Sequence, residues 1–510
     1  MFNFKEKTVL VIVFLVGAVN LIIEVVAFRL LSPVFGNTIF TTSSVIGTIL
    51  LALSIGYYLG GILGDKKPKF SILFLLVFFG GFLSVILFAF AKPILWFLGQ
   101  GLNIKTGPIV ASLILFLFPS LLLGMISPFA IKLKSLYSEK IGKISGSVFF
   151  WGTLGSLAGN FLTGFVLVPF FGVSKILLSS GLFLAALGFI GWLITRENKS
   201  KLSKLKISIF VLSLIFLLMF GIIIIASESL AQNVVFQKEG LYAKISVIKH
   251  MYKERPGMFL LLDNAYESGI FLDSQDLPFD YTKYYSFYNL TNPNPKKAFF
   301  LGGGAYTLPK KILQEEPNIE EVDIAEIDPA LFDIAREYFQ LPNDPRLKNN
   351  IIDGRYFLKN VDYKYDTVFM DAFDAFTIPN HLFTKEFFFI AKSKLTNSGT
   401  FIINVVASLS EKKSLFLHSA IKTFKTSFPS SYIFAIQGLE EESSQNFIFL
   451  GFADDNFKLD FKTPFISKNA DPLIREAESH LYQISERELS TAYIFTDDFA
   501  PIDYLNERAL

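Results

Sequence analysis

The chain has 510 residues, enough for about three domains, and its 52% hydrophobic content with 58 Phe is high for a water-soluble protein. Charge is unevenly distributed: residues 1–206 hold 18 Lys and Arg against 5 Asp and Glu, and the rest holds the remaining 29 of 47 and 40 of 45. The absence of cysteine excludes disulfides, thiolate nucleophiles and Cys-ligated metals. The four histidines lie far apart and no basic patch is interleaved with aromatic residues, so we expect neither a metal site nor nucleic-acid binding.

Residues 1–227 contain repeated apolar runs, each close to the roughly 20 residues that a helix needs to cross a bilayer. The runs lie at Thr8–Leu31, Phe40–Leu63, Ser71–Ala91, Gly107–Ile131, Ser145–Val168, Ile176–Thr195 and Ile207–Ala226. The first run is too long for a cleavable signal peptide and lacks a small-residue cleavage site. We therefore predict a polytopic α-helical membrane domain of about seven helices, with the lipid bilayer as its partner.

Loop charge predicts the orientation of these helices, because cytoplasmic loops are rich in Lys and Arg. One side carries 14 basic residues in its short loops. The other side carries Lys92, Lys105, Lys175 and, at the end of the first run, Arg29. The first side is expected to be cytoplasmic, and an odd number of helices then places everything after Ala226 outside the cytoplasm.

Residues 228–292 change from continuous apolar runs to alternating ones, which is typical of strands with one buried face. Strands are predicted at 241–248, 258–263 and 267–272, with a turn at Arg255-Pro256-Gly257. This stretch is expected to be a small β-hairpin subdomain, and Asn292-Pro293-Asn294-Pro295 is the linker after it.

The segment Lys296–Asp328 has the order strand, glycine turn, helix, strand, acid that begins a nucleotide-binding βαβ unit. Gly302-Gly303-Gly304 allow backbone N–H groups to approach a ligand, and Glu326 and Asp328 stand where an acid accepts from ribose hydroxyls. Thr307 occupies the place of the third glycine of the full dinucleotide fingerprint, so a glycine-rich turn of no function stays an alternative.

Further strands alternate with helices through residues 293–510, which predicts a Rossmann-like, methyltransferase-type doubly wound α/β domain. Ligands of such sheets lie over the carboxyl ends of the strands. Asp353 follows the third predicted strand and Asp371 the fourth, so both are expected to meet Glu326 and Asp328 at one cleft. The alternative for Asp353, which precedes Gly354, is simply to cap a helix.

With these motifs the chain resembles the spermidine synthase (polyamine aminopropyltransferase) family, in its branch with a fused multi-span membrane domain. The resemblance covers most of the chain. It is carried by the hairpin Leu262-Asp263-Asn264-Ala265-Tyr266-Glu267, the glycine turn, Glu326-Ile327-Asp328, Asp353-Gly354-Arg355, Asp371-Ala372-Phe373-Asp374, Leu53–Gly61 in the membrane part and the tail Thr496–Asp503.

The resemblance implies alkyl transfer from a sulfonium to a small cationic amine such as putrescine or another polyamine. It implies that Asp371 is the catalytic base and Asp374 a second acid. Asp353 and Gly354 would meet the adenine, with Tyr281 and Glu267 on the substrate side. The co-substrate would be decarboxylated S-adenosylmethionine or S-adenosylmethionine, without a metal.

Three departures from the family pattern leave the chemistry open. Ala305 stands where the family has an acid that holds the donor's ammonium, Glu267 replaces the hairpin glutamine, and Ala375-Phe376-Thr377 replace a proline-rich sequence. Without an acid at residue 305, discrimination against S-adenosylmethionine is expected to be weak or reversed.

Alternative functions are an S-adenosylmethionine-dependent methyltransferase on the same fold, or a transporter or receptor whose nucleotide fold senses a ligand. The expected location is the cell membrane, with several helices crossing it. Loop charge places the catalytic domain outside the cytoplasm, whereas the supply of a nucleoside donor favours the cytoplasm. A homo-oligomer is left open by the sequence.

Overall fold

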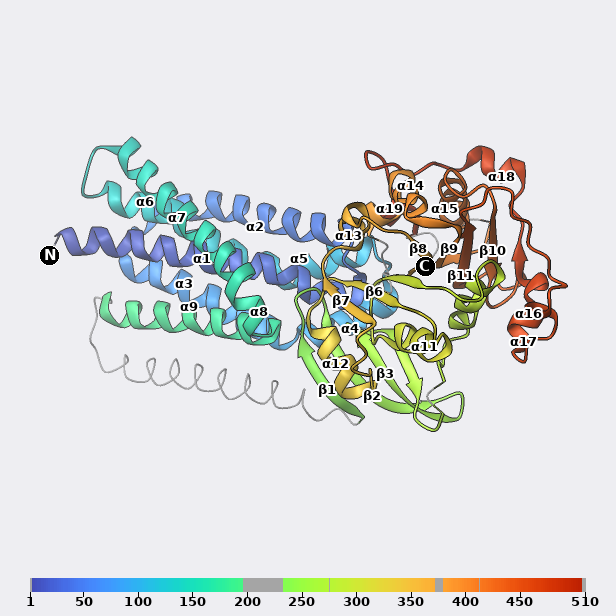
Figure 1. Ribbon diagram of the computed structural model, residues 1–510. Coiled ribbons are helices and arrows are strands. Elements are labelled where there is room, and N and C mark those ends of the chain that lie inside the picture. Colours follow the sequence, from blue (N-terminus) through green and yellow to red (C-terminus); the bar gives the residue numbers. More distant parts are fainter. Residues whose placement is uncertain (1, 196–232, 275, 372–378, 412, 507–510) are drawn as a thin grey trace. The chain divides into compact units, whose positions relative to one another are not determined.

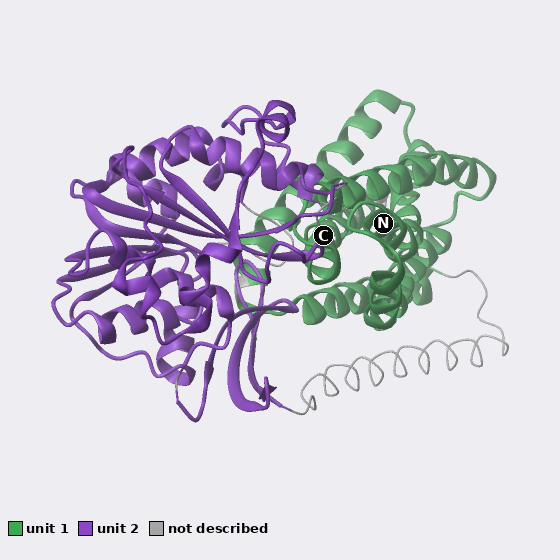
Figure 2. Ribbon diagram, turned by 90° about the vertical axis from the view of Figure 1, so that its right-hand side faces the viewer, with its two compact units in different colours: residues 1–232 green, residues 233–510 purple. Residues whose placement is uncertain are grey.

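The computed structural model describes residues 2–195, 233–274, 276–371, 379–411 and 413–506. The chain divides into two compact units, residues 1–232 and residues 233–510, shown in different colours in Figure 2. Each unit has its own hydrophobic core. The boundary between the predicted hairpin and nucleotide-binding domains falls inside the second unit, so this finer division stays a prediction.

The first unit is a bundle of helices (Figure 1). They are α1 (Phe2–Phe35), α2 (Ile39–Lys66), α3 (Phe70–Ala89), α4 (Ala91–Gly101), α5 (Thr106–Gly124), α6 (Ile126–Ser135), α7 (Ile141–Leu162), the π-helical turn η1 (Thr163–Leu167), α8 (Val168–Phe170) and α9 (Val173–Thr195). Five described segments are long and apolar enough to cross a membrane: Lys7–Phe35, Ile39–Lys66, Phe70–Ala89, Thr106–Ser135 and Val173–Thr195.

The remaining two predicted spans have different outcomes. The predicted span Ser145–Val168 lies on α7, η1 and α8 and is not one of these five segments; α7 is rich in glycine, serine and threonine. The predicted span Ile207–Ala226 lies outside the described residues. The count of about seven membrane helices therefore stays a prediction.

Glycines allow the helix backbones of the bundle to touch, which is the usual packing device of membrane helices. A Cβ at Gly155 or Gly159 of α7 would lie 2.0 or 2.3 Å from the carbonyl oxygens of Phe14 and Ala18 in α1. A Cβ at Gly60 of α2 would lie 2.3 Å from the carbonyl oxygen of Met125, next to α6. The glycines of α7 are therefore required for its close contact with α1.

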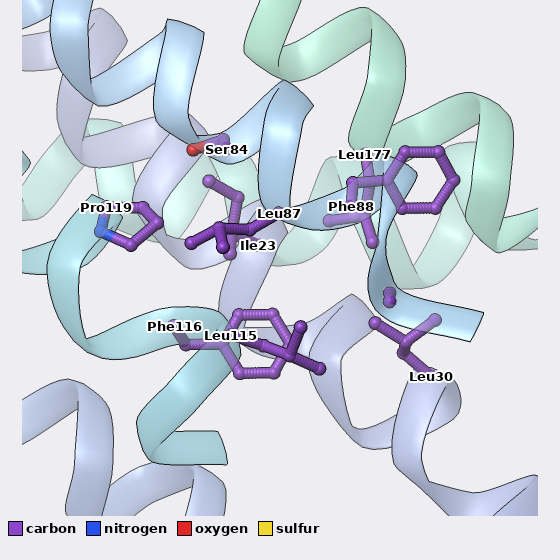
Figure 3. A pocket seen from close by; sticks show the side chains of 10 residues that line it. Ile23, Leu30, Ser84, Leu87, Phe88, Leu115, Phe116, Pro119 and Leu177 are labelled. Atoms are coloured by element: carbon purple, nitrogen blue, oxygen red, sulfur yellow. The ribbon is translucent and has the colours of Figure 1, made fainter. Parts of the chain in front are cut away.

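A pocket lies among the helices of this bundle, lined by side chains of α1, α3, α4, α5 and α9 (Figure 3). It contains about 310 Å³ of unfilled space, part of it open to the outside, and Ile23, Leu87 and Phe116 are among its walls. The one hydroxyl in the lining, that of Ser84, donates to the carbonyl of Gly80 at 2.8 Å. The lining therefore offers a ligand almost no polar contact.

The second unit begins with an antiparallel four-stranded sheet in the order β1-β2-β3-β4. Its strands are β1 (Val234–Glu239), β2 (Lys244–Tyr252), β3 (Arg255–Leu262) and β4 (Ala265–Phe271). The prediction of a turn at residues 255–257 was wrong. The chain turns at Lys253 and Glu254, both with positive φ (47° and 62°), as a two-residue hairpin whose twist matches its strands requires. Leu241 and Tyr242, predicted in a strand, lie in the turn before β2.

The larger sheet has eight strands in the order β12-β10-β11-β9-β8-β5-β6-β7. Its strands are β5 (Lys297–Leu301), β6 (Glu321–Glu326), β7 (Leu347–Ile351), β8 (Tyr365–Met370), β9 (Leu395–Ser408), β10 (Ser431–Ala435), β11 (Ser444–Phe452) and β12 (Leu481–Tyr482). The five strands β5 to β9 run parallel, and β10 to β12 continue the sheet with antiparallel pairs. The carboxyl ends of β5, β6, β7 and β8 therefore lie along one edge.

Helices cover both faces of this sheet (Figure 1). They are α11 (Thr307–Glu315), α12 (Ala330–Tyr338), α13 (Gly354–Asn360), α14 (Lys385–Ser393), α15 (Leu415–Lys425) and α19 (Ile502–Asn506), with η2 (Asp280–Leu290), η3 (Asn380–Leu382), α16 (Pro464–Ser467), α17 (Pro472–Arg475), η4 (Ala477–His480) and α18 (Glu486–Thr491) as shorter pieces. Adjacent residues Phe299 and Phe300 of β5 are buried on opposite faces. The predicted Rossmann-like doubly wound fold is confirmed.

Candidate active site

The glycine turn after β5 has a conformation that side chains would obstruct. Gly302 and Gly304 have φ values of 92° and 50°, in the left-handed region. A Cβ at Gly303 would lie 2.6 Å from the ring of Tyr306, and one at Gly304 would lie 2.6 Å from Oγ of Ser268. The turn therefore packs against a buried tyrosine on one side and β4 on the other.

Glu326, the last residue of β6, is joined to this turn. It is buried, and its Oε2 accepts from the backbone N–H of Gly303 at 2.8 Å while Oε1 accepts from that of Asp328 at 2.9 Å. Burial raises the pKa of Glu326, and the two N–H groups counter part of that effect. The carboxylate of Glu326 therefore connects the end of β6 to the glycine turn.

Asp328 is buried next to Glu326, but its hydrogen bond is of another kind. Its Oδ1 accepts from the backbone N–H of Ala330 at 3.0 Å, at the start of α12. A Cβ at Gly240, in the turn before β2, would lie 2.6 Å from Oδ2 of Asp328. This carboxylate therefore fastens a helix end and lies close to the small sheet.

Asp371 follows β8 and has the most perturbed carboxyl group of the site. Its Oδ2 accepts from the Tyr281 hydroxyl at 3.0 Å and its Oδ1 from Nδ2 of Asn404 at 3.2 Å. Asn404 is itself oriented by Asn446, whose Nδ2 donates to its Oδ1 at 2.9 Å. Desolvation of this partly buried carboxyl raises the pKa of Asp371 to about 6, and the hydrogen bonds from Asn404 and Tyr281 limit that rise.

One pocket brings together six of the residues that the sequence singled out. Gly302, Gly303, Gly304, Asp371, Tyr281 and Glu267 all line it. It also has Ser268, Phe279, Phe300 and Thr307 in its walls, and it contains about 480 Å³ of unfilled space, partly open to solvent. Residues from the small sheet, the glycine turn and the end of β8 therefore share a single site.

Asp353 and Gly354 are placed elsewhere along the same edge and do not line this pocket. Asp353 caps α13 by accepting from the backbone N–H of Tyr356 at 2.8 Å, and its Oδ2 lies 2.8 Å from Nε2 of His381. The hydrogen bond from His381 lowers the pKa of Asp353. A Cβ at Gly354 would lie 2.3 Å from Cγ of Leu301, so this glycine allows α13 to pack on β5.

Asp374, the predicted second acid, lies outside the described residues.

Three site features escaped the sequence-based prediction because they depend on distant segments. Ser268 accepts from the backbone N–H of Ala305 at 3.1 Å, and Asn404 holds Asp371. The third is a pair of contacts in which Arg355 bonds Asp497 through both Nη atoms, at 2.7 and 2.5 Å. The tail motif containing Asp497 was the only available signal for that contact.

Comparison with known proteins finds a family model that matches part of the second unit. Residues 286–456 match the spermine/spermidine synthase domain. Over this region the chain is similar to the spermine/spermidine synthase family. The matched region includes the glycine turn, Glu326 and Asp371, so the predicted family resemblance is confirmed.

Curated relatives agree with this family. A polyamine aminopropyltransferase of Vibrio vulnificus (strain CMCP6) is 25% identical over 282 residues, which is 54% of this chain and 91% of the relative. One of Streptococcus uberis is 33% identical over 147 residues, or 28% of this chain and 51% of the relative. Spermidine synthase 2 of Hyoscyamus niger is 30% identical over 189 residues, 35% of this chain and 59% of the relative. These names describe the relatives, and the chain spans only about half the length of the last two.

The solved structures that match part of this chain include a probable spermidine synthase from Corynebacterium glutamicum ATCC 13032. It is 20% identical, with a TM-score of 0.41 over 49% of this chain and 97% of that chain. Spermidine synthase from Thermotoga maritima is 18% identical, with a TM-score of 0.39 over 51% and 88%.

Proposed function

We propose that the second unit transfers an aminopropyl group from decarboxylated S-adenosylmethionine to an amine of the putrescine or polyamine type. The amine nitrogen forms a bond to the carbon beside the sulfonium while the carbon–sulfur bond breaks. The electron pair of that bond goes to sulfur, which becomes a neutral thioether. The nitrogen becomes cationic and loses a proton, so the reaction needs an acceptor for that proton.

Asp371 is the observation that carries this proposal. A carboxyl group with a pKa of about 6 is mostly ionised at pH 7 and still basic enough to take a proton from an amine in the transition state. Tyr281 and Asn404 donate to separate oxygens of this carboxylate and so fix its orientation in the pocket. We assign the general base to Asp371 and assign orientation of the carboxylate to Tyr281 and Asn404.

The glycine turn and Glu326 support placement of the donor in the same site. Open glycine backbone at the carboxyl end of β5, with a buried acid at the end of β6, is the arrangement that holds a ribose in nucleotide-binding sheets. Fixing the nucleoside there aligns the donor for attack within the pocket that Asp371 lines. Asp353, Gly354 and Asp328 are assigned to the adenine and ribose end of the donor.

The test uses full-length protein with a donor labelled in its aminopropyl group and a series of amines. We expect labelled product amine from the wild type and a loss of about 10²–10⁴-fold in turnover for Asp371→Asn. Asp344→Asn, in a partly exposed ion pair with Arg346, is the matched control and keeps activity. Methyl transfer from S-adenosylmethionine, or tight nucleoside binding without transfer to any amine, would replace this function by one of the two alternatives.

We also propose that the first unit anchors the enzyme in a membrane. Five described segments have the length and composition of membrane helices, and glycine-mediated backbone contacts join them. The protein should stay with the membrane fraction after high-salt and alkaline washing. Release into the supernatant would contradict the anchor.

A further inference from the structure

Strand β4 contains an irregularity at the edge of the pocket. Ser268 pairs with Leu260 and Tyr266 pairs with Leu261, so Glu267 is an extra residue in β4 and forms a β-bulge. In a regular strand consecutive side chains point to opposite faces, but Glu267, Ser268 and Gly269 all line the pocket. The bulge therefore redirects Glu267 into the site, which is a common use of bulges next to active sites.

Ser268 fastens this bulge to the glycine turn. Its Oγ accepts from the backbone N–H of Ala305 at 3.1 Å, and Gly304 packs against the same hydroxyl. The side chain of Ala305 is only 1% exposed and carries no charge. The residue after Gly304 therefore supplies no anion to the pocket, whereas the bulge beside it does.

The charges that face the pocket all have one sign. Among its described lining residues Glu267 and Asp371 are acidic and none is Lys, Arg or His. Both acids are close enough to Tyr281 to raise the pKa of its hydroxyl, with burial the larger cause. An ammonium is attracted to such a site, and a carboxylate is repelled because none of the described lining residues offers it a positive charge.

Resting on the proposed function, we propose that Glu267 selects a donor with an ammonium and no carboxylate at the end of its alkyl chain. Glu267 is a specificity-determining residue, because it supplies the negative charge that Ala305 does not. The expectation from Ala305 alone was weak or reversed discrimination against S-adenosylmethionine. The bulge leads to the opposite expectation, because it brings an acid from another strand into the pocket that the glycine turn lines.

The test is calorimetric binding of decarboxylated S-adenosylmethionine and of S-adenosylmethionine to the full-length protein. We expect the wild type to prefer the decarboxylated donor by at least tenfold, and Glu267→Gln to lower that preference about tenfold. Glu267→Asp keeps the charge and should keep most of the preference. Glu254→Gln is the matched control, because Glu254 is exposed in the same small sheet and does not line the pocket.

Equal binding of both donors by the wild type, or an unchanged preference in Glu267→Gln, would overturn the assignment while leaving aminopropyl transfer intact. Failure of both donors to bind the wild type would overturn the proposed function as well. A fall in affinity for both donors by the same factor in Glu267→Gln would also overturn it, because a structural role predicts that result and a charge-selective role does not.

Discussion

Replacing Asp371 by Asn should stabilise the second unit at neutral and alkaline pH while lowering turnover about 10²–10⁴-fold. Asp371 is partly buried, and desolvation raises its pKa from 3.8 to about 6. Because the folded state holds this proton more tightly than the unfolded state does, stability falls as pH rises between these two values. This difference in pKa corresponds to about 3 kcal/mol at pH 8. At pH 4 most of this cost is gone, and well below pH 3.8 the group is protonated in both states and the cost disappears.

The substitution is suited to the test because the hydrogen bonds can be kept. The introduced asparagine can still accept from Asn404 through its oxygen, and its NH2 group can donate to the Tyr281 oxygen, which also accepts. The free energy of opening can be measured by hydrogen exchange at the amides of β5, β8 and β9, the strands at the centre of the sheet. We expect Asp371→Asn to raise it by up to about 3 kcal/mol at pH 8 and to leave it nearly unchanged at pH 4.

Asp344→Asn gives the control of opposite sign. The hydrogen bond from Arg346 lowers the pKa of Asp344, so the stability it provides is present above the unfolded value and is lost as pH falls through the folded one. This variant should be less stable than the wild type at pH 8 and similar to it in strong acid. If Asp371→Asn instead destabilises the unit equally at pH 8 and pH 4, Asp371 is a structural hydrogen-bond acceptor and the base assignment is wrong.

Three further predictions concern the donor, the pH dependence and the orientation. Glu326→Gln should weaken nucleoside binding by about 1.5–3 kcal/mol, because a charged acceptor is lost, and unchanged affinity by calorimetry would remove Glu326 from the site. The rate should fall as pH drops below about 6, where Asp371 takes up its proton. Tyr281→Phe removes a hydrogen bond to the charged form of Asp371, so it should raise the pKa of Asp371 and move this fall in rate to higher pH. A fall in rate that stays at the same pH would show that Tyr281 does not act on the base. A reporter active only outside the cytosol, fused after Leu510, should be active; a silent reporter, with a cytosolic one working, would reverse the loop-charge orientation.

The order of strands and helices in the second unit was readable from the sequence, because local patterns encode it. Phe299 and Phe300 mark a strand buried on both faces, and the glycines after them mark a turn where side chains do not fit. The convergence of Glu326 and Asp371 on one edge also followed from the sequence, since parallel strands end on the same side. The apolar runs in the first unit likewise set where helices long enough for a membrane begin and end.

Tertiary structure alone decided how the site acquires its chemistry. Asn404 follows Asp371 by 33 residues and Tyr281 precedes it by 90, so no local spacing could reveal that both donate to its carboxylate. The pKa of Asp371 is likewise a property of burial, which depends on the surroundings of a residue and not on its type. The orientation of Glu267 came from a single extra residue in the pairing of β4 with β3, and pairing register is fixed only when two strands meet. The sequence therefore determined which groups line the edge of the sheet, and the packing of distant segments determined their charge, orientation and neighbours.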